Sequence, residues 1–99
     1  MIRHMFFGKI KPGVPDSEVD RLIAAWNAMG SKVETLRAIT AGRNACATDE
    51  QYTVALVADF DDWDGWKHYA EHPEHDAIRR EISSKIIDPN HKGTIQLEL

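Results

Sequence analysis

Three titratable side chains fall at positions that the sequence pattern turns toward the interior: His4, Tyr69 and His75. His4 alternates with apolar residues in an extended segment, and His75 shares helical spacing with Ile78. A buried imidazole beside a phenol offers a base and an acid whose pKa values the surroundings can move toward neutrality. That pair is the minimum for enolisation, isomerisation or aldol chemistry. The alternative is that each residue belongs to the core with a satisfied hydrogen bond.

Histidine spacing also raises the question of a metal. His68, His72 and His75 are separated by four and three residues and would share one face of an unbroken helix. Pro73 makes that unbroken helix doubtful, and no fourth ligand of clear spacing accompanies the three. We therefore predict no metal site, with two histidines facing solvent and one buried.

Other patterns for cofactors or nucleophiles are weak. The four aspartates between residues 59 and 64 do not match a calcium loop, because Phe60 and Trp63 interrupt them, so helix capping explains them better. There is no glycine-rich phosphate loop, and no cofactor is expected. Cys46 is the only cysteine, so no intrachain disulfide can form, and neither a base nor a clear helix start lies beside it. We expect an inert thiol.

Composition narrows the class of protein. The chain has 99 residues and a formal net charge of −4, with lysines and arginines scattered along it, which argues against a nucleic-acid partner. No apolar run approaches the roughly 18 residues that span a bilayer, and the opening segment alternates apolar with polar residues, unlike a signal peptide. We expect no membrane association and a cytoplasmic location.

Alternating apolar residues predict strands over 2–10, 52–60 and 94–99, and a weaker strand over 37–44. A polar turn is expected over 45–51. The last strand is expected to turn Ile95, Leu97 and Leu99 inward and the residues between them outward.

Helical spacing predicts three further elements. Asp16 or Ser17 is expected to cap the first helix, with Asp20 three residues after Ser17 in capping-box position and Gly30 to end the helix. A second begins after Asp61 or Asp62, and a third begins at Pro73 and stops at 88–90. The tryptophans are expected to anchor the core, although they could line a pocket: Trp26, Trp63 and Trp66.

The resulting order, βαββαβ, predicts an α+β, ferredoxin-like subunit in one domain spanning 1–99, with a four-stranded antiparallel sheet covered by helices on one face. Met5, Phe7, Ala55 and Val57 must then lie on the other face. An apolar sheet face open to water is an association surface, so we predict a homodimer that packs two sheets face to face.

Specific segments strengthen this interpretation: the opening MIRHMFFGKIKPGV, a central GRN, the strand YTVALVADFDD and the run YAEHPEHDAI. Over essentially its whole length the chain resembles the stress-responsive dimeric α/β barrel (Dabb) family. The resemblance implies a ferredoxin-like subunit whose sheets pair into a two-fold barrel. Two departures are Pro15, where the family commonly has a capping Ser or Asp, and the three tryptophans, which make a bulkier or a filled pocket.

Function transfers less directly, because the family includes stress proteins without assigned catalysis and a plant polyketide cyclase, olivetolic acid cyclase, which needs no cofactor. The cyclase's tyrosine and histidine pair falls on Tyr69 and His75, and its first-strand histidine falls on His4. Two hypotheses follow. One is a cofactor-independent cyclase, isomerase or lyase acting on a small carbonyl or aromatic compound; the other is a non-catalytic stability or small-ligand-binding protein.

Overall fold

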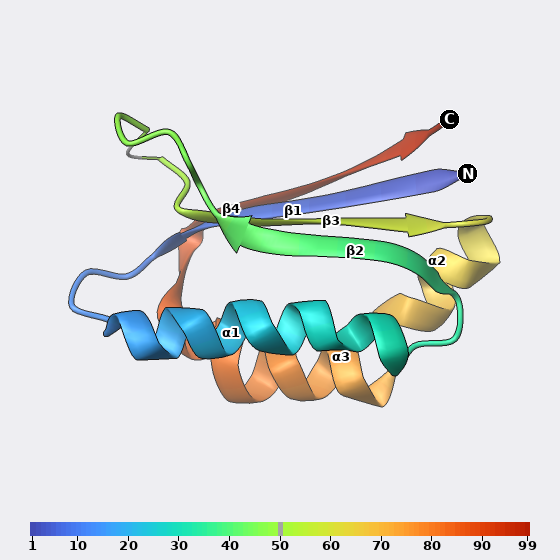
Figure 1. The fold of residues 1–99 in the computed structure, drawn as a ribbon, viewed down its shortest axis with the longest axis horizontal. Helices are drawn as coiled ribbons and strands as arrows, with labels where there is room; N and C mark the ends of the chain where they lie inside the picture. The colour runs from blue at the N-terminus through green and yellow to red at the C-terminus, as the bar shows by residue number, and fades with distance from the viewer. Residues whose placement is uncertain (50) are drawn as a thin grey trace.

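The computed structural model describes residues 1–49 and 51–99, so one residue of the predicted 45–51 turn lies outside it. It has two layers, a four-stranded antiparallel sheet of order β2-β3-β1-β4 and helices that all cover one face (Figure 1). The predicted βαββαβ order is confirmed. The elements are β1 (Ile2–Ile10), α1 (Asp16–Ala28), a 3₁₀ turn η1 (Met29–Ser31), β2 (Leu36–Arg43), β3 (Val54–Phe60), α2 (Trp63–Ala70), α3 (Pro73–Ile78), a π-helical turn η2 (Arg79–Ser83), α4 (Ser84–Ile86) and β4 (Ile87–Glu98).

The two central strands carry the core on their helix-facing side. In β1, Ile2 and His4 are buried, and Phe6 packs against the core. In β3, all four inward residues of the predicted alternation are buried: Val54, Leu56, Ala58 and Phe60. Tyr52, which we expected on the same face, lies before the strand and packs its ring on Phe7, 4.8 Å away between centroids.

Helix α1 buries the predicted apolar stripe, including Val19, Leu22 and Trp26. Its start differs from the prediction. The N–H groups of Glu18 and Val19 donate to the carbonyl of Pro15, so Pro15 is the N-cap, and no side chain caps the helix. The predicted caps are therefore wrong, because Asp16 and Ser17 already lie within the helix. The Asp20 side chain accepts from Arg43 instead of completing a capping box.

The second helical region is capped as predicted, since Asp62 Oδ1 accepts the N–H of Gly65 at 2.8 Å. Its buried face is formed by Gly65 and Tyr69, with Trp66 only partly buried. Trp63 is 47% exposed and donates its indole N–H to Glu98, so the prediction that it anchors the core is wrong. The spacing of Trp63 and Trp66 did indicate one helical face, but that face lies beside the buried one.

Pro73 breaks the helical run as predicted, and the continuation buries Ile78, Ile82 and Ile86. The helix ends at Ile86, and β4 begins at the next residue instead of at 94. The segment 88–90 thus belongs to the strand. Pro89 is tolerated there because β4 is an edge strand, where a missing backbone N–H costs little.

The side chains of β4 point to the opposite faces of the sheet from those predicted. Gln96 lies opposite His4 in the β1–β4 register and is partly buried on the helix side. Ile95 and Leu97 therefore point to the open face of the sheet and are 45% and 38% exposed. The error arises because alternation shows which residues share a face and does not show which face is covered.

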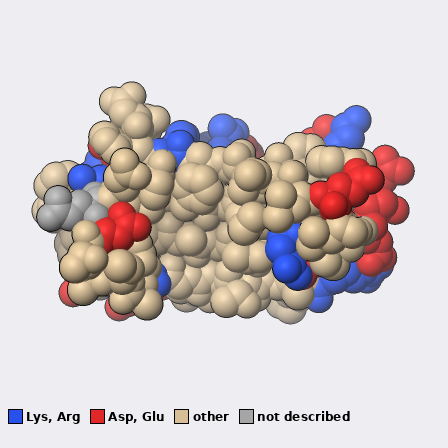
Figure 2. All heavy atoms as spheres, turned by 90° about the horizontal axis from the view of Figure 1, so that it is seen from above, with Lys and Arg blue, Asp and Glu red and all other residues tan. Residues whose placement is uncertain are grey.

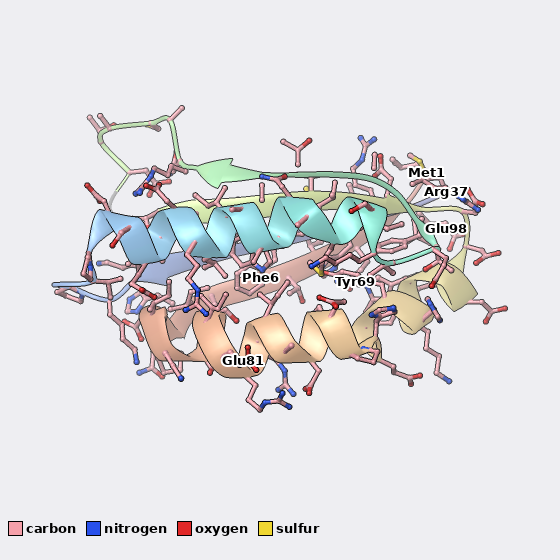
Figure 3. All side chains as sticks on the ribbon, turned by 60° about the horizontal axis from the view of Figure 1, so that its bottom comes forward. Met1, Phe6, Arg37, Tyr69, Glu81 and Glu98 are labelled. Atoms are coloured by element: carbon pink, nitrogen blue, oxygen red, sulfur yellow. The ribbon has the colours of Figure 1, made fainter. Side chains whose placement is uncertain are left out.

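Seen from its open side, the sheet presents a broad middle of uncharged side chains, with acidic and basic groups gathered toward the ends (Figure 2). A row across three strands, Val57–Met5–Ile95, follows from the strand registers. On the opposite side, Phe6 and Tyr69 lie between sheet and helices, whereas Arg37, Glu81 and Glu98 lie at the outside (Figure 3). Within the described residues, no helix is long and apolar enough to cross a membrane.

Candidate active site

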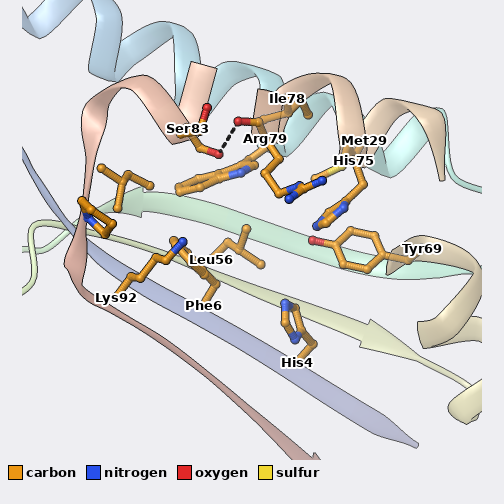
Figure 4. Close-up of a pocket in the computed structure, with 14 residues that line it drawn as sticks. His4, Phe6, Met29, Leu56, Tyr69, His75, Ile78, Arg79, Ser83 and Lys92 are labelled. Atoms are coloured by element: carbon orange, nitrogen blue, oxygen red, sulfur yellow. Dashed lines mark hydrogen bonds between the residues drawn. The ribbon is translucent and has the colours of Figure 1, made fainter. Parts of the chain in front are cut away.

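A cavity of about 240 Å³ lies between the sheet and the helices (Figure 4). Side chains from both layers surround it, and all three residues singled out from the sequence are among them. The volume falls just below the usual range of small-molecule pockets, about 300–1,000 Å³, which suits a compact ligand. Its lining comprises His4, Phe6, Trp26, Met29, Leu56, Tyr69, His75, Ile78, Arg79, Ser83, Ser84, Ile87, Pro89 and Lys92.

His4 stands on β1 with its ring fixed from one side. Its Nδ1 lies 2.8 Å from the side-chain amide nitrogen of Gln96 and 3.4 Å from the indole nitrogen of Trp66. An indole N–H can only donate, so Nδ1 is the acceptor. A neutral imidazole that accepts at Nδ1 carries its proton on Nε2. The hydrogen-bond network thus assigns His4 as an Nε2–H donor.

The surroundings keep His4 uncharged. Burial lowers the pKa of His4 to about 4, and the imidazole of His75 acts in the same direction. At neutral pH the ring is therefore a neutral hydrogen-bond donor at the cavity and not a cation. A neutral imidazole in this state can polarise a carbonyl oxygen.

Tyr69 reaches the cavity from α2. It is 2% exposed, its ring packs on Phe60 and on both imidazoles, and its hydroxyl points into the cavity (Figure 4). Burial raises the pKa of Tyr69 to about 12, so the phenol keeps its proton at neutral pH. It can donate a hydrogen bond to an oxygen atom of a bound molecule.

His75 completes the group from α3, with its ring 4.7 Å from that of Tyr69 between centroids. Burial is the main cause that lowers the pKa of His75, and the charge of Arg79 adds to it; Asp76 and a backbone hydrogen bond to Ala70 act in the opposite direction. A neutral imidazole keeps a lone pair on one of its two ring nitrogens. His75 is thus a neutral base at the cavity.

Two cations that the sequence analysis did not single out stand at the cavity: Arg79 from the π-helical turn and Lys92 from β4 (Figure 4). Both side chains are exposed. The Arg79 guanidinium donates to Asp76 at 3.0 Å, and the same carboxylate accepts from Arg80, which also pairs with Glu81 at 3.7 Å. Among the described residues that line the cavity, Arg79 and Lys92 are cations and none is a carboxylate. The cavity therefore carries a net positive charge near His75.

The structure brings His4, Tyr69 and His75 together as the sequence analysis expected of a catalytic group. Trp26 lines the cavity instead of filling it, and Trp66 orients His4 without lining it. Gln96 could not be recognised beforehand, because its role depends on the β1–β4 register. Arg79 could have been predicted from the sequence, because it follows His75 by four residues and so shares its helical face.

The three histidines that the sequence analysis considered as metal ligands do not lie together. His75 packs on Tyr69 at the cavity, whereas His68 and His72 lie near each other and near Glu34. The described residues around the cavity offer no such cluster.

Comparison with known proteins agrees with this architecture. A family model described as the stress responsive A/B barrel domain (Dabb) matches residues 2–91. No curated protein gives a significant match to the sequence.

Solved structures resemble the whole chain. A dimeric ferredoxin-like protein of unknown function from Thermobifida fusca is 26% identical, with a TM-score of 0.85 over 99% of this chain and 90% of that one. A dimeric protein of unknown function with a ferredoxin-like fold from Bacteroides fragilis is 25% identical, with a TM-score of 0.81 over 99% and 95%. The hydroxynitrile lyase of Passiflora edulis shares the fold at 14% identity, with a TM-score of 0.82 over 99% and 92%.

Proposed function

The chain belongs to the stress-responsive A/B barrel (Dabb) family, and we propose that its cavity performs cofactor-independent acid–base chemistry on a small carbonyl or aromatic compound. One observation carries this proposal: a neutral base and two neutral hydrogen-bond donors meet at one cavity. A base and donors on opposite sides of a bound carbonyl compound are what proton abstraction beside that carbonyl requires.

In the proposed reaction, the free nitrogen of His75 takes a proton from the carbon next to the carbonyl. The electron pair of that C–H bond moves into the carbonyl group, and the negative charge develops on its oxygen. The Tyr69 hydroxyl and the His4 Nε2–H donate to this oxygen, and both donors are partly desolvated, which strengthens their effect. His75 then returns the proton to carbon or to a leaving group, so no oxidant or reductant is consumed.

The cavity also selects the substrate. Its size fits a single aromatic ring or a short keto compound. Arg79 and Lys92 favour a carboxylate or another anionic group on the side of the molecule that lies away from His4. The preferred substrate class is therefore a small anionic carbonyl compound. One protein with this fold is a hydroxynitrile lyase, which is compatible with chemistry at a carbon centre.

We further propose that the working form is a homodimer sealed at the open sheet face. The support is the uncharged middle of that face, with exposed Val57, Ile95 and Leu97, and the dimeric state of the Thermobifida and Bacteroides proteins. A cytoplasmic location and the absence of a nucleic-acid partner stay predictions. The exposed free thiol of Cys46 is compatible with a reducing compartment.

The test is deuterium exchange. The protein is incubated in D₂O with small phenyl ketones and keto acids, and NMR follows label entering the carbon beside the carbonyl. We expect exchange above the buffer rate, and a loss of about 100-fold or more in His75→Gln, since a positioned base contributes about 10²- to 10⁴-fold. His91→Gln, at an exposed histidine of β4, is the matched control.

Full exchange activity in His75→Gln would overturn the assignment of the base. If the wild type exchanges no probe, and thermal-shift screening against phenolic, β-keto and lactone compounds finds no ligand, the non-catalytic stability protein is the better description. Light scattering and melting temperature show that each variant remains folded and associated.

A further inference from the structure

Away from the cavity, three side chains with metal-binding groups come together from different elements. Glu34 precedes β2, His68 lies in α2, and His72 is the N-cap residue of α3. One ligand atom from each can be chosen so that all three lie within 4.8 Å of one another. We propose that Glu34, His68 and His72 form a binding site for a divalent transition-metal ion, with zinc as the ion that fits the donor set best.

The donor set decides the class of ion. Two imidazoles and one carboxylate suit zinc and its neighbours, whereas magnesium and calcium prefer oxygen ligands alone. With three protein ligands, a water molecule takes the fourth tetrahedral position, as in open zinc sites. The side chains of Glu34 and His68 are both well exposed, so water and the ion reach them freely.

The present distances require only a small adjustment. His68 Nε2 lies 2.9 Å from Glu34 Oε2, and the rings of His68 and His72 lie 5.4 Å apart between centroids at 74°. Ligand atoms on a tetrahedral zinc ion at about 2.0–2.1 Å are roughly 3.3 Å from one another. The Glu34–His68 pair must open slightly, and any pair near the 4.8 Å limit must close by roughly 1.5 Å. Rotation of the three side chains can supply both changes.

Hydrogen bonds hold the three elements in place. Thr35, next to Glu34, donates its hydroxyl to the carbonyl of Gly65 in α2 at 2.8 Å. The backbone N–H of Glu74 donates to His72 Nδ1 at 3.1 Å, so the neutral ring carries its proton on Nε2 and its lone pair is at Nδ1. An ion bound at Nδ1 would replace this hydrogen bond. An ion pair between Lys32 and Glu74, at 3.6 Å, joins the same segments. These contacts hold the segments that carry the three ligands near one another before an ion binds.

Sequence spacing indicated a different set, His68, His72 and His75, for which an unbroken helix would be needed. The break at Pro73 directs His75 to the cavity, while His68 and His72 stay close together. The third ligand is Glu34, 34 residues before His68, and only the tertiary fold reveals it.

A bound ion would link the segment before β2 to both α2 and α3. Those two helices carry Tyr69 and His75 into the cavity. Binding is therefore expected to stabilise the α2–α3 junction and raise the melting temperature, whether or not the cavity is catalytic.

The experiment uses the full-length protein, stripped with a chelator and titrated with Zn²⁺ by calorimetry and with Co²⁺ by visible absorbance. We expect one ion per chain and the strong d–d bands of four-coordinate Co²⁺. Loss of an outer-shell partner already weakens metal affinity by about 10- to 100-fold, so loss of a direct ligand should cost at least as much. The variants are Glu34→Gln, His68→Gln and His72→Asn, in which asparagine preserves an N-cap acceptor.

His91→Gln is the matched control, because His91 Nδ1 pairs with Asp88 at 2.9 Å as an exposed histidine–carboxylate pair on another part of the chain. It should bind Zn²⁺ as the wild type does. The proposal is overturned if the wild type binds Zn²⁺ no more tightly than His68→Gln and His72→Asn do, or if His91→Gln loses as much affinity as these two variants.

Discussion

Gln96 and His4 lie directly opposite each other on neighbouring strands, and the Gln96 amide nitrogen is 2.8 Å from His4 Nδ1. Together with the indole of Trp66, this contact determines which nitrogen of His4 carries the proton. A residue of the last strand, Gln96, thereby controls the hydrogen-bonding character of a cavity residue on the first strand.

Gln96→Glu should reverse this control. A carboxylate beside Nδ1 accepts a hydrogen bond from the protonated nitrogen and stabilises the charged ring, so we expect the pKa of His4 to rise by about 1–3 units, as for other charges within this distance. NMR titration of the ring nitrogens measures it directly. Gln96→Leu, which removes the amide without adding charge, should not produce that rise; equal titration curves for the two variants would contradict the assigned tautomer.

Stability should depend on pH through His4. Its pKa is about 4 in the folded chain, below the ordinary 6.5 of an unfolded one. Between these two pH values the unfolded state binds more protons than the folded state, so the free energy of unfolding rises with pH. This part of the stability is lost as the pH falls from about 6.5 to about 4. The difference corresponds to at most about 3 kcal/mol.

His4→Asn should flatten that dependence, because the amide oxygen can replace Nδ1 as acceptor but does not titrate. Urea unfolding between pH 4 and 7 measures the change. Part of the slope of the free energy of unfolding against pH should remain in the variant, because the pKa of His75 is also lowered. His91→Asn, at an exposed position, should leave the whole slope, and an unchanged slope in His4→Asn would contradict the origin proposed for it.

Arg79→Gln should raise the pKa of His75, since the guanidinium is one of the causes that lower it. The exchange reaction needs neutral His75, so its acidic limb should move to higher pH. A carboxylate-bearing ligand should also bind about fivefold more weakly, which is the order of one exposed charge pair.

Arg80→Gln is the control for Arg79, because both guanidinium groups donate to Asp76, at 2.9 Å for Arg80, but only Arg79 lines the cavity. Equal effects of the two substitutions on the pH profile and on ligand binding would assign them to the lost ion pair and not to the cavity.

Val57→Lys or Ile95→Lys should dissociate the proposed dimer. Both side chains flank Met5 on the open sheet face, and a two-fold axis would place each new charge in the interface twice, once from each subunit. We expect the dimer dissociation constant to rise by at least about 100-fold, since like charges across an interface cost several kcal/mol. Light scattering over a concentration series gives the result. Ala24→Lys adds the same charge on the exposed side of α1 and should stay dimeric.

Sequence alone predicted the parts of the fold in which pattern and environment agree. In β3 the inward alternation leads to the helix layer, and the burial of Val54, Leu56 and Phe60 follows it. In β4 the same pattern failed, because Ile95 and Leu97 belong to the open face. Alternation has two solutions for a strand between a helix layer and a second apolar surface, and only pairing with β1 selects one.

The candidate site was predictable to a similar degree. His4, Tyr69 and His75 could be assigned to inward faces from local periodicity, and they do meet at the cavity. Their protonation could not be predicted, since it depends on Gln96, which is distant in sequence and meets His4 only through strand register. Local sequence patterns indicate which way a side chain points, whereas its partners in the folded structure determine its protonation state.

The π-helical turn between α3 and α4 restricts insertions and deletions in the segment between His75 and Ile86. It holds more residues per turn than an α-helix, Arg79 and Ser83 from it line the cavity, and Ile82 from it enters the core. Deleting one residue would restore regular winding, but it would change the spacing between Arg79 and Ile82, which serve the cavity and the core from the same turn. Either the cation would leave the cavity or the isoleucine would leave the core, so related sequences that keep both features should keep the number of residues between His75 and Ile86.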